Sequence, residues 1–322
     1  MRKKLLEIRN LVIDYYTVTD VIHAVRGVDL DLYEGEALCI VGESGCGKST
    51  LGSALALMLP PNAIVRSGSI IYNGIDLLKA GRDVVEKIRG REISMVFQDP
   101  LATFSPLHTV GEVLEDIAIH KLGVPKEEAK KIAIEALKNV RIVDVERVLK
   151  SYPHELSGGM LQRIAIAAAL LVKPRVLIAD EPTTMLDATI QLQILDLLEE
   201  IMRMSRISLV LITHNINVAR KICERVVVMY AGKVVEEGDT EKLLAEPLHP
   251  YTQLLLKAIP RAPHRIAKVM HIPGEVPDPR NDIAGCPFAN RCPNIFDRCF
   301  KEVDYVAIDN RKVLCNLYRK PG

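Results

Sequence analysis

Gly42-Glu43-Ser44-Gly45-Cys46-Gly47-Lys48-Ser49-Thr50 matches the phosphate-binding pattern G-x-x-x-x-G-K-[S/T] at every fixed position. The apolar run at 37–41 before it predicts a buried strand, and residues 51–57 after it predict a helix. Glycines let such a loop wrap a polyphosphate, so that backbone N–H groups and the helix N-terminus point at it. We expect Lys48 to contact the β- and γ-phosphates and the Ser49 hydroxyl to bind Mg²⁺.

The composition is that of an ordinary globular protein. The chain has 322 residues, 26% of them charged, and a net charge of +1. Its length suits more than one domain, and the balanced charge gives no electrostatic case for nucleic-acid binding. No apolar run approaches the roughly 18 residues of a membrane span, and no long apolar stretch follows the basic start at 1–7. We therefore expect a cytosolic protein, in which the seven cysteines are not structural disulfides.

Alternating apolar residues before the glycine loop predict strands of an antiparallel sheet that leans over it. They are Leu11, Ile13 and Tyr15, followed by Val28, Leu30 and Leu32. Tyr15 and Tyr16 lie near the start of this sheet, and one of these rings can stack on an adenine base. We favour Tyr15, with a core or surface tyrosine as the alternative.

Polar residues follow three further predicted strands. The apolar run 176–179 ends in Asp180, placed to hold Mg²⁺ through its water shell, and Glu181, the candidate general base. Gln98 ends the run 93–97, where its amide can reach a metal or an attacking water. His214 follows the run 207–212 and can contact the γ-phosphate and hold Glu181 and water in line.

Ser157-Gly158-Gly159 precedes an apolar helix and forms a second anion-binding arrangement. One chain does not need two phosphate cradles for one γ-phosphate, but two chains facing head to tail do. The pattern therefore predicts a sandwich dimer in which each chain supplies Ser157 and Gly159 to the nucleotide of the other.

Taken together, these motifs resemble the ATP-binding subunits of ABC transporters over nearly the whole chain. The resemblance implies Walker A at 42–50, the Q-loop at Gln98, the signature at 156–159, Walker B at 176–180, the D-loop at Asp187 and the H-loop at His214. It places Tyr15 at the adenine. It also implies that the nucleotide contacts Gly42, Ser44, Gly45, Cys46, Gly47, Lys48, Ser49, Thr50, Gln98, Asp180 and Asp187 on one or other subunit, with Mg²⁺ at Ser49, Gln98 and Asp180.

The implied fold is α/β, a RecA-like P-loop NTPase core with an N-terminal antiparallel β-subdomain and an inserted helical subdomain. We predict a nucleotide-binding domain at 1–238, with the helical insertion at about 101–165, and a cysteine-containing extension at 239–322.

Finer features are similar to the dipeptide and oligopeptide importer branch, and most similar to the D-type subunits of dipeptide permeases. These features are the run 152–160, with Met160 after the signature glycines, and the stretches 249–252 and 272–274. The branch implies peptide uptake, with nickel uptake as an alternative. It also implies a second ATPase subunit (a paralogue or a second copy), two membrane permease subunits, an extracytoplasmic peptide-binding protein acting indirectly, and a place on the inner face of the membrane. Three departures, Met185, Asn215 and Phe104-Ser105-Pro106, remove no catalytic group.

Two other classes of function are weaker. A soluble ABC ATPase of translation or DNA repair would carry two cassettes or a long coiled-coil insertion, and neither is present in this sequence. A GTPase switch would carry an Asn-Lys-x-Asp motif, which is also absent.

Four cysteines crowd the C-terminal part: Cys286, Cys292, Cys299 and Cys315. Clustered thiols in a cytosolic protein suggest a metal. Because the C-x₂₋₄-C pairs of zinc sites are absent, we favour a [4Fe–4S] cluster over Zn²⁺, with unmetallated or disulfide-bonded thiols as the third possibility. Cys46 differs, because amide dipoles and Lys48 are expected to lower its pKa, so that alkylation of Cys46 would block ATP binding.

Overall fold

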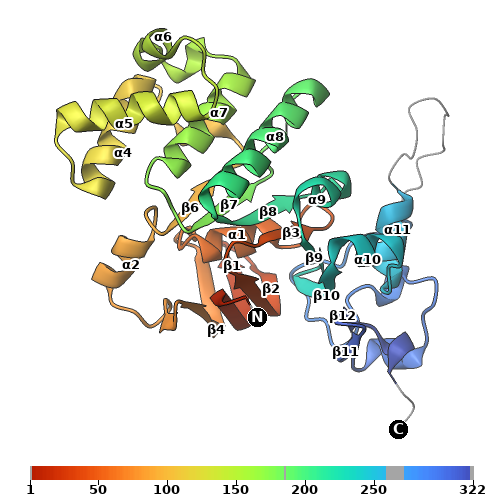
Figure 1. Cartoon of the computed structure of the whole chain (residues 1–322). Coiled ribbons are helices and arrows are strands. Elements are labelled where there is room, and N and C mark those ends of the chain that lie inside the picture. Colours follow the sequence, from red (N-terminus) through yellow and green to blue (C-terminus); the bar gives the residue numbers. More distant parts are fainter. Residues whose placement is uncertain (1, 185, 259–271, 320–322) are drawn as a thin grey trace.

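The computed structural model describes residues 2–184, 186–258 and 272–319, so Met185 lies outside the described residues. An eight-stranded sheet runs through the molecule in the order β11-β12-β10-β9-β3-β8-β7-β6 (Figure 1). Its parallel strands are β3 (Ala37–Val41), β6 (Ile93–Val96), β7 (Val176–Asp180), β8 (Ser208–Thr213) and β9 (Arg225–Tyr230). The predicted parallel core is therefore present.

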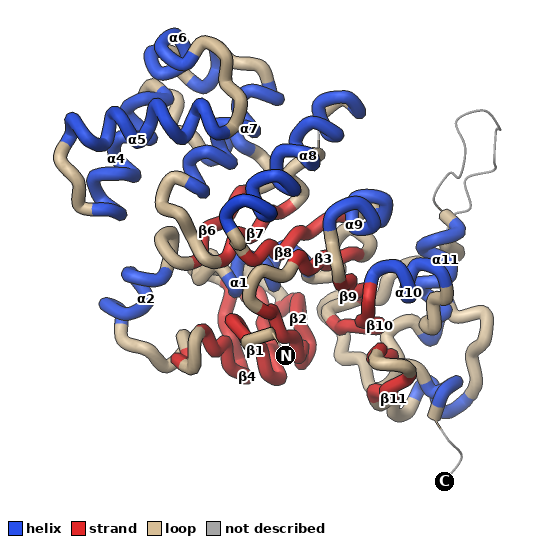
Figure 2. The backbone as a smooth tube through the Cα atoms, in the orientation of Figure 1, coloured by secondary structure: helices blue, strands red, loops and turns tan. Residues whose placement is uncertain are grey.

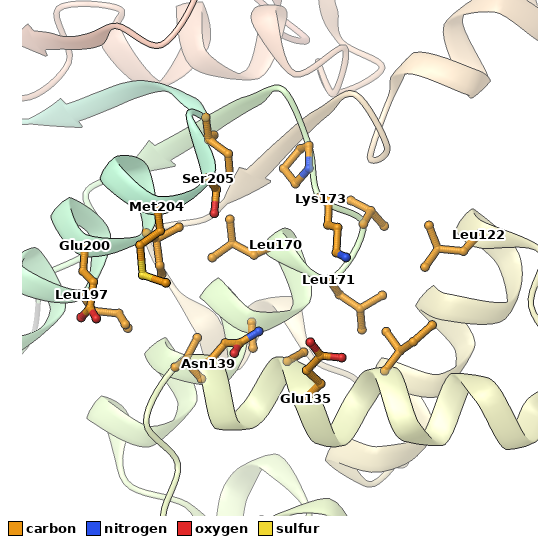
Figure 3. Close-up of a pocket in the computed structure, with 18 of the residues that line it drawn as sticks. Leu122, Glu135, Asn139, Leu170, Leu171, Lys173, Leu197, Glu200, Met204 and Ser205 are labelled. Atoms are coloured by element: carbon orange, nitrogen blue, oxygen red, sulfur yellow. The ribbon is translucent and has the colours of Figure 1, made fainter.

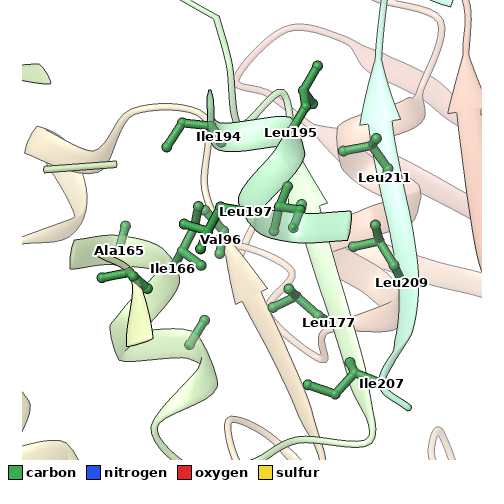
Figure 4. Close-up of a cluster of buried hydrophobic side chains, with 14 of the residues drawn as sticks. Val96, Ala165, Ile166, Leu177, Ile194, Leu195, Leu197, Ile207, Leu209 and Leu211 are labelled. Carbon is green, nitrogen blue, oxygen red and sulfur yellow. The ribbon is translucent and has the colours of Figure 1, made fainter. Parts of the chain in front are cut away.

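Helices cover both faces of this sheet. Every residue of β3 and β7 is buried, because strands covered on both faces need apolar side chains on both. The helix α1 (Lys48–Leu55) packs on one face, and α7 (Gly158–Leu170), α8 (Ala188–Ser205) and α9 (Ile216–Ile222) pack on the other. Figure 4 shows the second of these layers, where Leu177, Leu209 and Leu211 of the sheet meet Ile194 and Leu197 of α8.

A four-stranded antiparallel sheet, in the order β2-β1-β4-β5, forms the predicted N-terminal subdomain. Its strands are β1 (Lys4–Tyr16), β2 (Val21–Tyr33), β4 (Ala63–Tyr72) and β5 (Ile75–Asp76). Asn73 and Gly74 have φ of 48° and 83°, which is the left-handed pair that a tight hairpin turn requires. Leu11 and Ile13 of β1 share a buried cluster with Leu51 of α1, so this sheet packs beside the glycine loop.

The helical subdomain lies to one side of the sheet (Figure 2). After α2 (Arg82–Ile88) and β6 come α3 (Pro100–Thr103), α4 (Val110–Leu122), α5 (Lys126–Asn139), α6 (Val145–Lys150), a 3₁₀ turn (Pro153–Glu155) and α7. Thr109 and Glu112 form a capping box that starts α4. Pro125 is the N-cap of α5.

The C-terminal part joins the main sheet. The strand β10 (Lys233–Asp239) pairs with β12 (Arg311–Leu314), which pairs with β11 (Tyr305–Ile308). The remaining elements are α10 (Thr240–Ala245), α11 (Pro250–Lys257) and the 3₁₀ turns Ala289–Arg291, Asp297–Phe300 and Asn316–Tyr318. The predicted domain boundary at 238 therefore falls inside β10, and the division into domains stays a prediction. In the described part of the chain, no helix is both long and apolar enough to cross a membrane.

Candidate nucleotide site

The glycine loop joins the end of β3 to the start of α1. Lys48 is 4% exposed, and its ammonium donates hydrogen bonds to the carbonyl oxygens of Gly42 (3.0 Å) and Glu43 (2.9 Å). Gly47 has φ of 98°, and a Cβ there would lie 2.2 Å from the Ala24 carbonyl oxygen. Only glycine fits that position. The loop therefore brings the ammonium to the start of α1, where the helix dipole favours an anion.

Ser44 and Gly45 are exposed at the tip of the loop, and Ser49 is exposed at the first turn of α1. The Ser49 hydroxyl donates a 3.1 Å hydrogen bond to Oδ1 of Asp180, at the end of β7. Burial raises the pKa of Asp180, and the neighbouring Glu181 raises it further, while Ser49 and Lys48 act in the opposite direction. Hydroxyl and carboxylate oxygens are ligands that Mg²⁺ prefers, so these two residues fit the metal of a nucleotide complex.

Glu181 lies at the centre of the predicted catalytic group. One of its carboxylate oxygens is 3.2 Å from Nδ1 of His214. The other accepts a 2.9 Å hydrogen bond from the Thr184 hydroxyl and lies 3.5 Å from the Gln98 amide nitrogen. Three strand ends, those of β6, β7 and β8, thus bring Gln98, Glu181 and His214 together, and their catalytic roles stay predictions.

Cys46 behaves differently from the prediction. Its side chain is 1% exposed, and a Cβ on Gly42 would lie 2.8 Å from its sulfur. Burial raises the pKa of this thiol more than the nearby Lys48 ammonium lowers it. The expected lowered pKa is therefore wrong, because the side chain turns into the core instead of facing the phosphate site.

Tyr15 lies beside the first turn of α1. Its hydroxyl is 3.3 Å from the Thr50 hydroxyl, and either oxygen can be the donor. Tyr16, the alternative stacking residue, is 42% exposed and points away from the core. Tyr15 thus lies beside the helix that follows the glycine loop, and its stacking on an adenine stays a prediction.

The signature residues lie at the N-terminus of α7. Ser157 caps this helix through the Met160 N–H, and both Ser157 and Gly158 are exposed. A Cβ on Gly159 would lie 2.9 Å from Cγ2 of Ile190 in α8. Asp187 caps α8 by accepting from two backbone N–H groups. Among the described residues, no hydrogen bond or ion pair joins Ser157, Gly158 or Gly159 to the glycine loop.

Of the departures noted in the sequence, Asn215 is the N-cap of α9, accepting from the Asn217 N–H at 3.0 Å. Asparagine and aspartate both cap helix N-termini, so Asn215 makes the same capping hydrogen bond that an aspartate would make at this position. Phe104 is 6% exposed and belongs to the core beside the helical subdomain.

The four C-terminal cysteines converge. The Cys286 N–H donates to the Cys299 carbonyl at 2.8 Å. Burial, and then the nearness of the other three sulfurs, raises the pKa of Cys286 to about 12. Burial and the nearness of Cys292 and Cys299 raise the pKa of Cys315 to about 11. Across the described ranges, however, no three His, Cys, Asp or Glu side chains are arranged to hold a metal ion. Cys39 and Cys223, which lie outside this group, are buried.

Sequence reasoning missed two residues that contact the glycine loop from the C-terminal extension. Arg291 forms an ion pair with Glu43, and the Tyr251 hydroxyl accepts a hydrogen bond from the Glu43 N–H. Tyr251 lies in the stretch 249–252 and Arg291 directly before Cys292, but neither pattern indicates a contact with the glycine loop, which only the tertiary structure shows.

A cavity of about 830 Å³ lies elsewhere, between α5, the end of α7 and the end of α8 (Figure 3). Apolar side chains make up most of its lining, among them Leu122, Leu170, Leu171 and Leu197, and the charged Glu135 and Lys173 also line it. None of the nucleotide-site residues named above lines it.

The fold and this site define a P-loop nucleotide-binding protein with a cassette-type helical insertion. The sequence model described as "ABC transporter" matches residues 25–184, and the model described as "Oligopeptide/dipeptide transporter, C-terminal region" matches residues 235–299. The chain belongs to the family of ATP-binding subunits of ABC transporters, the ATP-hydrolysing cassettes, and the predicted fold class is confirmed.

Two curated relatives cover almost the whole chain. The dipeptide transport ATP-binding protein DppD of Bacillus subtilis is 45% identical over 91% of this chain and 88% of its own length. The oligopeptide transport ATP-binding protein AppD of the same organism is 42% identical over 99% of this chain and 98% of its own. A solved dimer of the ATP-binding cassette MJ0796, in a post-hydrolysis state with ADP and Pi, has a TM-score of 0.66 and 33% identity, covering 73% of this chain and 98% of that one.

Proposed function

We propose that this chain is the ATP-hydrolysing subunit of an importer of dipeptides or oligopeptides. The observation that carries the proposal is the meeting of Ser49 with Asp180, and of Glu181 with His214, at the carboxyl edge of one parallel sheet. The two curated relatives, both named for peptide transport, support the substrate class.

The proposed mechanism assigns one role to each residue. Lys48 and the loop N–H groups bind the β- and γ-phosphates, and Ser49 and Asp180 hold Mg²⁺ with Gln98. Tyr15 stacks on the adenine. Glu181 takes a proton from the attacking water, while His214 keeps the carboxylate and the water in line. Lys48 would stabilise the charge that develops on the transferred phosphoryl group, and Mg²⁺, when held by Ser49 and Asp180, would supply further positive charge there.

The proposed working unit contains two cassettes. Ser157 and Gly158 are exposed at the start of α7, where the Ser157 hydroxyl bonds only within its own helix turn, to the Met160 N–H, and this exposure supports contact with the nucleotide on a second cassette. Asp187 lies beside them at the start of α8. The solved dimer of the related cassette MJ0796 supports such an assembly. The partner is a paralogue or a second copy, and closure of the pair would drive two permease subunits from the inner face of the membrane, with a peptide-binding protein outside.

A [4Fe–4S] cluster at Cys286, Cys292, Cys299 and Cys315 belongs to the same proposal. The crowding of four thiols within residues 286–315, with the Cys286 N–H bonded to the Cys299 carbonyl at 2.8 Å, supports this part of the proposal. The cysteine spacing lacks the C-x₂₋₄-C pairs of zinc sites, so we favour the cluster over a single Zn²⁺. A larger inorganic core suits four more widely spaced thiolates. Such a cluster would tie the loops of the extension together and would take no part in the chemical step of ATP hydrolysis.

The catalytic proposal is tested by steady-state ATPase assays and gel filtration. Lys48→Ala should lose ATP binding, because the phosphates lose their cation. Glu181→Gln should bind ATP, turn it over at a small fraction of the wild-type rate, and accumulate as an ATP-bound dimer. Glu199→Gln, an exposed position on α8, is the matched control and should behave as wild type. Normal hydrolysis by Glu181→Gln would refute the assignment of the base.

The substrate is tested in cells from which this chain has been deleted. Uptake of a labelled dipeptide and uptake of nickel are measured with and without a plasmid carrying the chain. Restored dipeptide uptake alone supports the proposal. Restored nickel uptake alone would replace it with the nickel importer, and restoration of neither would favour an ATPase uncoupled from transport.

A further inference from the structure

The C-terminal extension contacts the nucleotide site directly. We propose that Arg291 and Tyr251 are positioning residues for ATP, because they fix Glu43 and through it the glycine loop. The inference rests on the proposed function, in which this loop binds the phosphates of ATP.

The first contact is a two-pronged ion pair. One guanidinium nitrogen of Arg291 lies 2.8 Å from Oε2 of Glu43, and the other terminal nitrogen lies 3.2 Å from Oε1. The Arg291 side chain is 5% exposed and that of Glu43 is 27% exposed. A bidentate pair of this kind fixes direction as well as distance.

The guanidinium is itself held by the extension and the core. Its Nε donates to the Pro273 carbonyl at 2.9 Å, and Nη2 donates to the Ile272 carbonyl at 3.0 Å. Nη1 donates to the Tyr230 hydroxyl at 3.0 Å. Because all three guanidinium nitrogens are hydrogen-bonded, the Arg291 side chain is held in one position.

Tyr251 supplies the second contact. Its hydroxyl accepts a 2.9 Å hydrogen bond from the Glu43 N–H, and its ring is fully buried. Ring centroids lie 4.6 Å from Tyr230 and 5.3 Å from Phe288. This aromatic cluster fixes the position of the hydroxyl, because a packed ring has little freedom to move.

Glu43 is thus held at each of its polar groups. The Tyr251 hydroxyl accepts a hydrogen bond from the Glu43 N–H, and the Arg291 guanidinium pairs with the Glu43 carboxylate. The Lys48 ammonium donates a hydrogen bond to the Glu43 carbonyl oxygen. Glu43 precedes the phosphate-binding Lys48 by five residues in the sequence. Without Arg291, an uncompensated negative charge would lie next to the site that must accept the anionic phosphates of ATP.

We predict that removing the charge of Arg291 weakens the affinity for ATP. Arg291→Met should weaken ATP binding about tenfold, equivalent to about 1.4 kcal/mol, with little change in kcat at saturating ATP. The double variant Glu43→Gln/Arg291→Met removes the uncompensated charge and should bind ATP more tightly than Arg291→Met alone. Tyr251→Phe, which keeps the ring, should weaken binding by about threefold, the scale of one net hydrogen bond.

The experiment measures Mg·ATP affinity by equilibrium titration, and KM and kcat by steady-state assays, on the full chain. Arg319→Met is the matched control, since Arg319 lies in the same extension and pairs with Asp304 at 2.6 Å; it should bind ATP as wild type does. Lys48→Ala tests the proposed function separately.

The outcomes are distinct. A rise in KM for Arg291→Met, relieved in the double variant, supports the inference. Wild-type affinity in both Arg291→Met and Tyr251→Phe overturns it, as does a double variant that binds ATP no better than Arg291→Met. If Arg291→Met does not fold, Tyr251→Phe decides, with wild-type affinity again overturning the inference. Undiminished ATP binding by Lys48→Ala would instead refute the nucleotide site itself.

Discussion

His214 Nδ1 lies 3.2 Å from Oε1 of Glu181, although the two residues follow different strands. The strands β7 and β8 are parallel neighbours, so their carboxyl ends meet at one edge of the sheet. Glu181 has φ of 45°, which is unusual for a residue with a side chain, and its N–H donates to the Ile212 carbonyl at 2.9 Å. A strained backbone that is held at a strand end is a common feature of catalytic positions.

The pair predicts that His214→Ala will slow hydrolysis without weakening ATP binding. The imidazole acts through the carboxylate and the water, so kcat should fall by about 100-fold while the Kd for ATP stays close to wild type. ATPase assays and nucleotide titration measure the two quantities. His120→Ala, at an exposed position in α4, is the control. Hydrolysis at the wild-type rate by His214→Ala would remove this histidine from the mechanism.

The raised pKa of Asp180 predicts that this residue lowers the stability of the fold while it supports hydrolysis. Its pKa is raised by burial and by Glu181, so the folded chain holds that proton more tightly than the unfolded chain does. Above the ordinary aspartate pKa of about 3.9, the ionised carboxylate therefore costs stability. Asp180→Asn, which keeps an acceptor for Ser49, should raise the melting temperature at neutral pH and lose Mg²⁺-dependent hydrolysis.

The pH dependence checks the cause of that gain. At a pH below the ordinary value, the wild-type carboxyl is protonated in both states, so the advantage of Asp180→Asn should disappear. Thermal melts of both proteins across the acidic range measure this. A lower melting temperature for Asp180→Asn at neutral pH would contradict the prediction.

The sequence could predict the catalytic group because parallel strands carry positional information. Short apolar runs identify β6, β7 and β8, and a polar residue after each run must lie at the same sheet edge. Gln98, Glu181 and His214 could therefore be placed together before any coordinates were known. The glycine loop is equally local, since its strand, turn and helix are continuous in the chain.

The contacts of the extension could not be predicted in this way. Arg291 and Glu43 are separated by 248 positions, and no periodicity or spacing links them. The sequence also could not predict that the Cys46 side chain points into the core. The loop motif fixes the path of the backbone, but it does not determine which side chains turn inward. The ion pair depends on the packing of the 3₁₀ turn Ala289–Arg291 against the loop, and the direction of Cys46 depends on the buried cluster that it joins.

The signature glycine predicts a packing defect. Because a Cβ at position 159 would lie 2.9 Å from Cγ2 of Ile190, Gly159→Val should push α7 and α8 apart and destabilise the chain by about 1–3 kcal/mol. Denaturant unfolding measures the loss. Gly81→Val is the control, since a Cβ there meets no atom within 4 Å. Adding Ile190→Ala should restore part of the stability, and equal stability of wild type and Gly159→Val would show that the helices adjust freely.

The four-cysteine region predicts a metal content that can be measured directly. Anaerobically purified protein should contain about four iron and four sulfide per chain, with broad visible absorbance. Cys292→Ser should lose the iron, whereas Cys223→Ser, a buried thiol outside the group, should retain it. One zinc per chain without colour would replace the cluster by a zinc site, and the absence of any metal would leave four free thiols.

Loss of that cluster should also weaken ATP binding. Cys292 follows Arg291 directly, so a ligand that orders the cysteine loops also orders the Arg291 side chain that pairs with Glu43. Because coupling between two sites is reciprocal, ATP should in turn slow the release of iron to a chelator. The assay follows visible absorbance after chelator addition, with and without Mg·ATP, in the Glu181→Gln variant to prevent turnover. Lys48→Ala, added to that variant, should abolish the protection, and equal release rates with and without ATP would show that the extension and the loop are uncoupled.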